Sequence, residues 1–451
     1  MRTIEGVGIG YRRELAHALL ANPSVVDFVE VVAEACRDTA QRREALALAE
    51  VWPVIPHGVK LSLGSAEGID VSRARDFGRL ARDLRAPLVS EHISFTRAGG
   101  REIGHLTDLP MTREAVAVVA RNVATLRRSL PDVPLLLENV ARAFVWPESD
   151  HEMDEGTFHA EVVRATGCNL LLDVGNLYAN AVNASREPFQ LLASYPLDHV
   201  AMLHVAGGVM EHGFYFDTHA HAVPDPVFAL VARLQERGAL PILLERDGGF
   251  DEASAIVSEV DRLRAIGRAT GNGQRATGAR SEAPREAPGS RLQAPGSRET
   301  LLESQKVMAD ALTRGDAVGL SAPVVRARTV LERKRADDAL PLLPELSPRL
   351  GSLDALDLGR IPGTPRLATM TAVADALRIA DAACAVPALA RFALRDVALL
   401  RARFEEGPDG PRPRSMPYVG RERTSDGLAL WVLKGFGQGA PVRLIERGAR
   451  R

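Results

Sequence analysis

Cysteine is scarce in this chain, which has only Cys36, Cys168 and Cys384 and no CxxC pair. Three isolated cysteines supply neither a disulfide framework nor a thiolate zinc site, and such a composition is typical of a protein from the reducing cytosol. Long apolar runs are also missing, because no stretch approaches the roughly 18 apolar residues that a membrane span needs. The N-terminal stretch lacks the apolar segment of a signal peptide. We therefore predict a cytoplasmic protein with no membrane partner.

A large excess of charge of one sign is absent as well. The chain has 56 basic and 58 acidic residues, for a formal net charge of −2. A charge balance this even gives no global field to attract nucleic acid or an anionic membrane, so we expect no nucleic-acid partner. The 451 residues are 46% hydrophobic, which is ordinary for a soluble globular protein and enough for two or three domains.

Eight short apolar runs are present in the first 250 residues. Helical spacing of apolar residues lies between them, most clearly over 72–84, 112–130 and 225–238. The runs predict strands near 5–10, 26–31, 52–57, 87–92, 134–138, 169–173, 200–204 and 241–245. Strands that alternate with helices indicate βα units, and eight such units in about 265 residues match a TIM (β/α)8 barrel.

A doubly wound open sheet is the second architecture that such alternation permits. That fold typically carries a GxGxxG phosphate turn after its first strand. Here the glycines fall at positions 6, 8 and 10, which is not that spacing. The barrel is therefore the favoured α/β architecture.

The composition divides the chain into three regions. Residues 1–266 carry the predicted barrel. Residues 267–300 have almost no large apolar side chains and repeat the sequence APGSR, which predicts a flexible linker. Residues 301–451 form a separate, mostly helical domain, with helical patterns over 323–340 and 367–404 and a terminal β-hairpin.

Seven of the eight predicted strands end in a histidine or a carboxylate. In a TIM barrel the carboxyl ends of the strands meet at one mouth, where catalytic groups collect. The strand ends are Glu30, His57, His92, Glu138, Asp173, His204 and Glu245. The segment FDTHAH, after the seventh strand, adds Asp217, His219 and His221, which point the same way if the segment is extended.

Imidazole and carboxylate ligands without cysteine suit iron, manganese, zinc or cobalt. The set is too large for one ion, so two or three ions with bridging carboxylates is the natural interpretation. A lone histidine at a strand end is more often a hydrogen-bonded structural residue, but the repeated register favours ligation by His57, His92 and His204. The sequence leaves open whether Glu30 and His221 are ligands or orient other ligands.

A nucleophilic triad fits the sequence less well. There is no GxSxG elbow, and no partner for Ser62 is suggested by spacing.

The motifs, taken in order, resemble a known family. HGVKLSLG, SEHISF, LLLENV, LLLDVGNLYANA, MLHVAGG, FDTHAH and LLERD are similar to those of the multinuclear non-haem iron-dependent oxidative enzymes, which include the methanobactin-biosynthesis oxidase. The resemblance covers roughly residues 4–265. It implies a TIM barrel with two or three irons of mixed Fe(II)/Fe(III) valence, with dioxygen as co-substrate. It also implies oxidation of cysteine in a ribosomally made precursor peptide.

The resemblance also implies the site residues. The metal ligands would be His57, His92, Glu138, Asp173, Asn176, His204, Asp217, His219 and Glu245. Among these, Asp217, His219 and Glu245 would act in catalysis. Asn176 stands where some members have histidine, and its weaker amide ligand implies a third iron that is loosely held or absent. Family members usually need a partner protein that binds the leader peptide, and residues 301–451 would be a fused equivalent.

The sequence is also compatible with other functions. A divalent-metal sugar isomerase or epimerase of the xylose-isomerase type uses the same barrel and a similar mouth. A metal-dependent phosphodiesterase such as an abasic-site endonuclease does so too, but the near-neutral charge argues against DNA binding. An inert barrel that serves only as a binding module is disfavoured by the density of ligand-type residues.

Overall fold

The computed structural model describes most of the chain in two compact units. One, the barrel unit, comprises Met1–Thr96 and Leu106–Gln305; the other, the C-terminal unit, comprises Arg97–His105 and Lys306–Arg451. The described residues are 4–143, 146–147, 150–211, 213–250, 253–271, 297–313, 324–325, 331, 335–336, 338–350, 370–407, 410–423 and 429–447.

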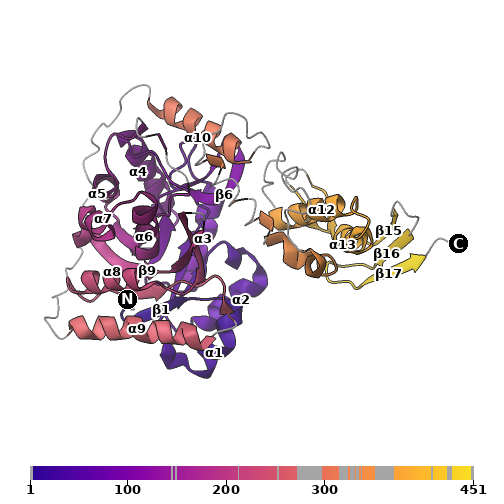
Figure 1. Cartoon of the computed structure of the whole chain (residues 1–451), viewed down its shortest axis with the longest axis horizontal. Coiled ribbons are helices and arrows are strands. Elements are labelled where there is room, and N and C mark those ends of the chain that lie inside the picture. Colours follow the sequence, from indigo (N-terminus) through magenta and orange to yellow (C-terminus); the bar gives the residue numbers. More distant parts are fainter. Residues whose placement is uncertain are drawn as a thin grey trace. The chain divides into compact units, whose positions relative to one another are not determined.

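Eight parallel strands close into a barrel, which confirms the predicted TIM architecture (Figure 1). In barrel order the strands are β1 (Val7–Gly10), β2 (Val29–Val32), β3 (Val54–Gly58), β4 (Val89–His92), β7 (Leu135–Glu138), β8 (Asn169–Asp173), β9 (Val200–Val205) and β12 (Ile242–Leu244). The last strand pairs with the first through the register Gly8↔Leu243. Nearly every residue in these strands is buried, as expected for a parallel sheet covered by helices.

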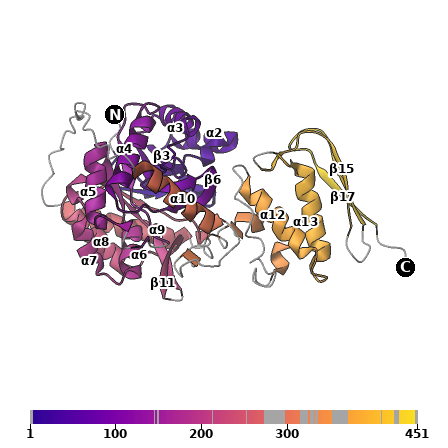
Figure 2. The same ribbon diagram turned by 90° about the horizontal axis from the view of Figure 1, so that it is seen from above.

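Helices follow the barrel strands and cover their outer faces (Figures 1 and 2). They are α1 (Ala16–Ala21), α2 (Thr39–Leu48), α3 (Val71–Asp83), α4 (Arg113–Arg127), α5 (Glu155–Thr166), α6 (Val174–Asn183), α7 (Pro188–Ser194), α8 (Asp225–Gln235) and α9 (Ala253–Gly271). The predicted start of α4 is correct, because the Thr112 hydroxyl accepts a hydrogen bond from the Ala115 amide at 3.1 Å.

A layer of apolar side chains fills the inside of the barrel. It includes Phe28, Ile55, Leu136, Leu171, Met202 and Leu243. Side chains two positions apart on a strand point to the same face. The residues two positions further along the chain therefore point into the same interior, at the carboxyl ends of the strands. They are Glu30, His57, Glu138, Asp173, His204 and Glu245.

Two β-hairpins are inserted at this end of the barrel. The hairpin of β5 (Phe95–Ala98) and β6 (Arg101–Thr107) follows β4, and the hairpin of β10 (Gly207–Glu211) and β11 (Phe214–His221) follows β9. The second hairpin contains the FDTHAH segment, so its strand pairing sets the positions of Asp217 and His219.

Helix α10 (Ser297–Thr313) begins within the barrel unit. The fully buried Gln305 amide accepts a hydrogen bond from the Ala66 amide at 2.8 Å and donates one to the Gly64 carbonyl at 2.7 Å. These contacts tie the helix to the loop that follows β3. Most of the linker predicted over 267–300 lies outside the described residues, between Gly271 and Ser297.

The described part of the C-terminal unit includes a pair of helices and a three-stranded antiparallel sheet, in the order β15 (Tyr418–Arg423), β16 (Ala429–Lys434) and β17 (Val442–Arg447). The predicted terminal hairpin is β16 and β17, and β15 extends it. The helix predicted over 367–404 is two helices, α12 (Thr371–Ala383) and α13 (Ala390–Arg403). They are separated by a turn that holds Pro387, which lacks the amide hydrogen a continuous helix needs.

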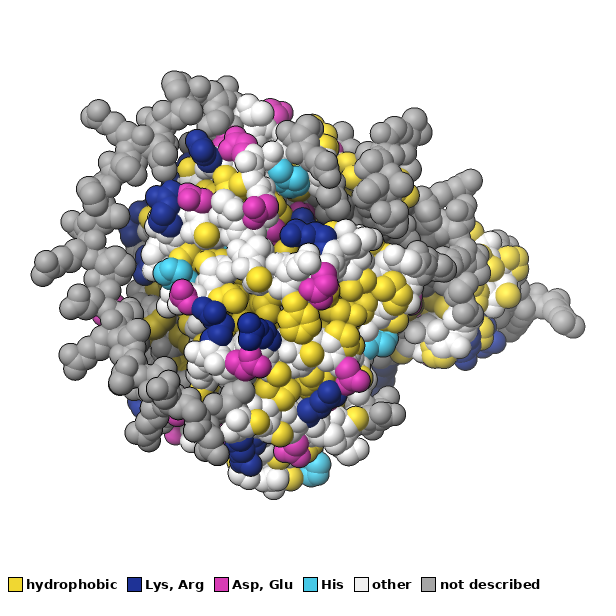
Figure 3. Space-filling model, turned by 60° about the vertical axis from the view of Figure 1, so that its left-hand side comes forward, with side chains coloured by type: hydrophobic (Ala, Val, Ile, Leu, Met, Phe, Trp, Pro, Cys, Tyr) yellow, Lys and Arg dark blue, Asp and Glu magenta, His cyan; other side chains and the backbone are white. Residues whose placement is uncertain are grey.

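The short strands β13 (Phe404–Glu405) and β14 (Arg412–Pro413) pair with each other in this unit. The helix predicted over 323–340 lies largely outside the described residues. Among the described helices, none combines the length and the apolar character that crossing a membrane requires. Basic and acidic side chains are interspersed on the face drawn in Figure 3.

Candidate metal centre

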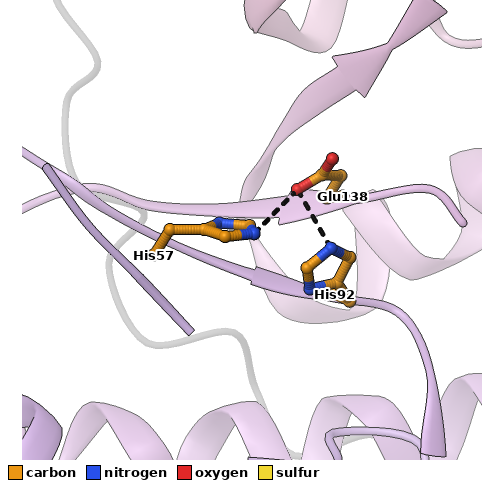
Figure 4. A group of neighbouring side chains, drawn as sticks. All are labelled: His57, His92 and Glu138. Carbon is orange, nitrogen blue, oxygen red and sulfur yellow. Dashed lines mark ion pairs between the residues drawn. The ribbon is translucent and has the colours of Figure 1, made fainter. Parts of the chain in front are cut away.

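His57, His92 and Glu138 form the first group of possible ligands (Figure 4). Glu138 Oε2 lies 3.5 Å from His57 Nε2 and 3.4 Å from His92 Nε2. His92 Nδ1 lies 3.1 Å from the Gly58 carbonyl, which can only accept, so this nitrogen carries the hydrogen. His92 Nε2 therefore faces a carboxylate oxygen, and once it has lost its proton its lone pair would be directed at a cation held between the two atoms.

His57 is held in the same way on the neighbouring strand. Its Nδ1 lies 2.8 Å from the Ser90 hydroxyl, which leaves Nε2 directed at Glu138. Hydrogen bonds of this kind fix the ring orientation of a metal-binding histidine. Ser90 lies two residues before His92 on the same strand, so strand alternation turns its side chain into the barrel. There it can orient the ring of His57.

Glu138, Asp173, His204 and Glu245 form the second group. His204 Nδ1 lies 3.2 Å from Glu138 Oε1 and 3.4 Å from Glu245 Oε2. On the other side of the ring, His204 Nε2 lies 3.2 Å from Glu30 Oε2. Glu30 can accept the Nε2 hydrogen and leave Nδ1 as the ligand atom, so the structure favours an orienting role for Glu30.

His219, Glu245 and Asp247 form the third group. His219 Nδ1 lies 3.3 Å from Glu245 Oε2, and its Nε2 lies 2.7 Å from Asp217 Oδ2. Asp217 and His219 are thus brought together as predicted, with Asp217 on the far side of the ring from Glu245. Asp247 was missed by the sequence reasoning, although it follows Glu245 by two residues. Its carboxylate also accepts a hydrogen bond from Arg12 Nε at 2.9 Å.

The prediction that His221 points the same way as its neighbours is wrong. His219 has a φ of 53°, a left-handed conformation that breaks the alternation of the strand. The exposed His221 instead places Nδ1 2.7 Å from the Thr218 hydroxyl. A left-handed conformation in a residue other than glycine costs on the order of 1–3 kcal/mol and occurs preferentially at functional sites.

Asn176 lies in the first turn of α6, beside Asp173. Its backbone amide donates to Asp173 Oδ1 at 2.6 Å, and its side-chain Nδ2 donates to the Asn139 carbonyl at 3.0 Å. The nitrogen end of the amide is therefore engaged, while the buried Oδ1 has no hydrogen-bond partner. This orientation presents an oxygen for ligation.

Several buried polar atoms of this site have no hydrogen-bond partner. They include Glu138 Oε2, Asp173 Oδ2, Asn176 Oδ1, His204 Nδ1 and Asp217 Oδ1. Leaving one such atom unsatisfied costs about 1–3 kcal/mol. All five are atoms that can donate a lone pair to a metal, so the residues present fit a metal ion.

The pKa values show how strongly these groups interact without a metal. Burial and the charge of Asp217 raise the pKa of Asp173 to about 7. Burial opposes the charging of His92, but Glu138 and Glu91 raise its pKa to about 9. Burial also opposes ionisation of Glu138, but His204 and His92 lower its pKa to about 2. Crowded carboxylates that need positive charge nearby are expected at a cation site.

Comparison with a family model identifies one match over residues 6–268, described as "RiPP precursor modification enzyme MbnB/TglH/ChrH". A UPF0276 protein of Streptomyces avermitilis is 41% identical over 268 residues, covering 57% of this chain and 54% of the relative. The chain therefore spans about half the length of that relative. A UPF0276 protein of Caulobacter vibrioides is 35% identical over 269 residues, covering 59% of this chain and 95% of the relative.

Solved structures with a similar fold are more distant. A xylose isomerase domain protein from Planctomyces limnophilus has a TM-score of 0.43 and 14% identity, covering 60% of this chain and 100% of its own. Endonuclease IV from Thermus thermophilus has a TM-score of 0.39 and 18% identity, covering 57% of this chain and 98% of its own.

Proposed function

The chain belongs to the MbnB/TglH/ChrH family of RiPP precursor modification enzymes, and we propose that its barrel binds two or three irons and uses dioxygen to oxidise cysteine in a precursor peptide. The family match supports a peptide substrate made by the ribosome. The isolated cysteines and the even charge balance support a cytoplasmic location without a nucleic-acid partner.

The observation that carries this proposal is the sharing of two carboxylates among three ligand groups. Glu138 belongs to the first and second groups, and Glu245 belongs to the second and third. Within each group the ligand atoms lie within 4.8 Å of one another. A carboxylate has two oxygens and can bridge neighbouring ions, so this chain of groups suits a multinuclear centre.

The donor set suits iron, as it suits manganese, zinc or cobalt, and the resemblance of the motifs favours iron among these. His57, His92 and Glu138 would hold one ion, and Glu138, Asp173, His204 and Glu245 a second. Asn176, Asp217, His219 and Glu245 would serve a third, with Asp247 as an additional oxygen donor. When bound, iron supplies the redox chemistry by which dioxygen oxidises a cysteine side chain.

The residues of the chain contribute position and charge. Ser90 and Gly58 fix the imidazoles of His57 and His92, while Glu30 fixes His204. The burial of these ligands excludes water, which strengthens their electrostatic interactions with charged groups bound at the mouth. We propose that Asp217, His219 and Glu245 act in catalysis on the bound peptide, since the His219 ring contacts both carboxylates through its two nitrogens.

We also propose that residues 301–451 act as a separate domain that binds the leader peptide or a partner protein, joined to the barrel by a linker within 267–300. The division of the chain into two compact units supports this assignment, although Leu301–Gln305 pack with the barrel unit.

Metal analysis tests the proposal. The chain purified under anaerobic conditions should contain two or more irons, with a Mössbauer signature of mixed valence, and should consume dioxygen when supplied with a cysteine-containing precursor peptide. A chain that holds only zinc or magnesium and isomerises sugars without oxygen uptake would contradict it. The matched control is a precursor peptide with serine in place of cysteine, which should cause no oxygen uptake.

A further inference from the structure

The three-stranded sheet of the C-terminal unit has two unlike faces. One face packs on α13, where Leu430 and Val432 join Leu394, Ala398 and Ala402 in a buried cluster. Alternation along the strands places the remaining side chains on the opposite face. We call this opposite face the outer sheet face. Its described side chains are Val419, Arg421, Arg423, Ala429, Trp431, Leu433, Arg443 and Ile445.

Large apolar side chains are exposed on the outer sheet face. Val419 is 67% exposed, Ile445 48% and Trp431 37%. They lie close together, because the register pairs Trp431 with Ile445 and Val419 with Leu433. Exposed apolar side chains gathered on one sheet face are typical of an interaction surface.

The charges of the sheet are divided between its two faces. The described acidic side chains of these strands, Glu422 and Glu446, lie on the helix side, where Glu422 pairs with Arg401 at 2.9 Å and Glu446 with Arg395 at 2.6 Å. The outer sheet face carries Arg421, Arg423 and Arg443, all exposed. Arg421 also lies over the Trp431 ring, 5.2 Å from its centroid. The described part of this face is therefore apolar at its centre and positive at its margins.

We infer that the outer sheet face binds an acidic, amphipathic peptide segment. Carboxylates of the peptide would pair with Arg421, Arg423 and Arg443, and its apolar side chains would cover Trp431, Val419 and Ile445. The arginines alternate with apolar residues across the strands, through pairs such as Arg421↔Trp431 and Leu433↔Arg443. This pattern matches a segment in which acidic and apolar residues alternate.

Nucleic acid is the other polyanion that a basic sheet face could bind. A base-stacking platform needs several aromatic side chains. The described part of the outer sheet face has one, Trp431, among the aliphatic Val419, Leu433 and Ile445. The inference rests on the proposed function, because a barrel that modifies a peptide gives a reason for a peptide-binding surface on the same chain.

The test measures binding of a synthetic peptide of alternating glutamate and leucine to the full chain without metal. Trp431 reports the contact, because the other two tryptophans, Trp52 and Trp146, are buried. We expect a blue shift of tryptophan emission that disappears in Trp431→Phe. We also expect binding that weakens as NaCl rises from about 0.05 to about 0.5 M.

Charge reversal on the outer sheet face supplies the decisive variant. Arg421→Glu, Arg423→Glu and Arg443→Glu combined should lower the peptide affinity by roughly 10-fold or more, because attraction becomes repulsion. The matched control makes the same charge change at exposed arginines of the barrel unit, with Arg79→Glu, Arg164→Glu and Arg233→Glu. The control should bind the peptide like the unchanged chain. Circular dichroism confirms that both variants fold.

Three outcomes would overturn the inference: no peptide binding by the unchanged chain, equal losses in the two triple variants, or tighter binding of a single-stranded oligonucleotide than of the peptide. Because the assay uses neither iron nor turnover, failure here leaves the iron-dependent chemistry of the barrel intact. Failure of iron loading likewise leaves this peptide site intact.

Discussion

Buried acidic side chains have different hydrogen-bond partners in the C-terminal unit and in the candidate metal centre of the barrel. In the C-terminal unit, Asp375 accepts hydrogen bonds from Arg335 at 2.7 and 2.9 Å, and Asp396 accepts from the Leu346 amide at 2.8 Å. In the barrel, Glu138 and Asp173 each retain a buried oxygen without a hydrogen-bond partner. Burial alone therefore does not identify function, whereas incompletely satisfied carboxylates gathered with histidines in one place indicate a metal site.

The largest effect that would test this contrast is expected from Glu138→Gln. Glutamine keeps the shape of the side chain but replaces one ligand oxygen with an NH2 group, which donates hydrogen bonds and cannot ligate. Because Glu138 is shared by two groups, iron content should fall by at least one ion per chain and peptide oxidation by roughly 100-fold or more. Iron analysis with an oxygen-uptake assay measures both, and full iron loading would contradict a bridging role.

The matching change in the C-terminal unit is Asp375→Asn. Asp375 is 4% exposed and also contacts Arg378 at 3.1 Å, so its loss leaves two largely buried guanidinium groups without their counter-charge. We expect the free energy of unfolding of this unit to fall by about 3 kcal/mol, with iron content unchanged. Urea denaturation and metal analysis test this, and a loss of iron would remove the distinction between the units.

The smallest and most gradual effect concerns pH in the metal-free protein. The pKa of Asp173 is raised from 3.8 to about 7, and that of His92 from 6.5 to about 9. Because both pKa values are raised, each group keeps its proton up to a higher pH in the folded chain than in the unfolded chain. The free energy of unfolding should therefore decrease as pH rises from about 5 to about 9.

The measurement is urea denaturation of the metal-free chain across this range. Iron loading should show the reverse trend and improve with pH, since ligands must lose their protons to bind metal. If the free energy of unfolding of the metal-free chain increases with pH instead, these two groups are not coupled to folding as the structure indicates.

Much of the fold, and many of the side chains that the structure gathers into possible ligand groups, could be predicted from the sequence. A parallel barrel strand is buried on both faces, so a histidine or carboxylate at its end, as at His57 or Glu138, is conspicuous against its apolar neighbours. Strand alternation then fixes the direction of the side chain. The same rule identifies Ser90, two residues before His92, although it was not used for that residue.

The remaining features depend on contacts that no local pattern reveals. The left-handed backbone of His219 makes the side chains of His219 and His221 point in different directions. This conformation is imposed by tertiary structure, and no glycine at this position indicates it in the sequence. The orienting role of Glu30 depends on contact with His204, 174 residues away in sequence. Strand β15 was missed because its exposed face is mainly arginine, which gives it no clear apolar alternation.

The two hydrogen bonds of Gln305 bear on where the barrel unit could be cut from the chain and transferred to another protein. A chain cut after residue 268, where the family match ends, would leave the Ala66 amide and the Gly64 carbonyl without these partners, at a cost of about 1–3 kcal/mol each. Both groups lie in the loop that follows His57. For transplantation or fusion, a piece of this chain that keeps the described barrel unit intact therefore extends through Gln305.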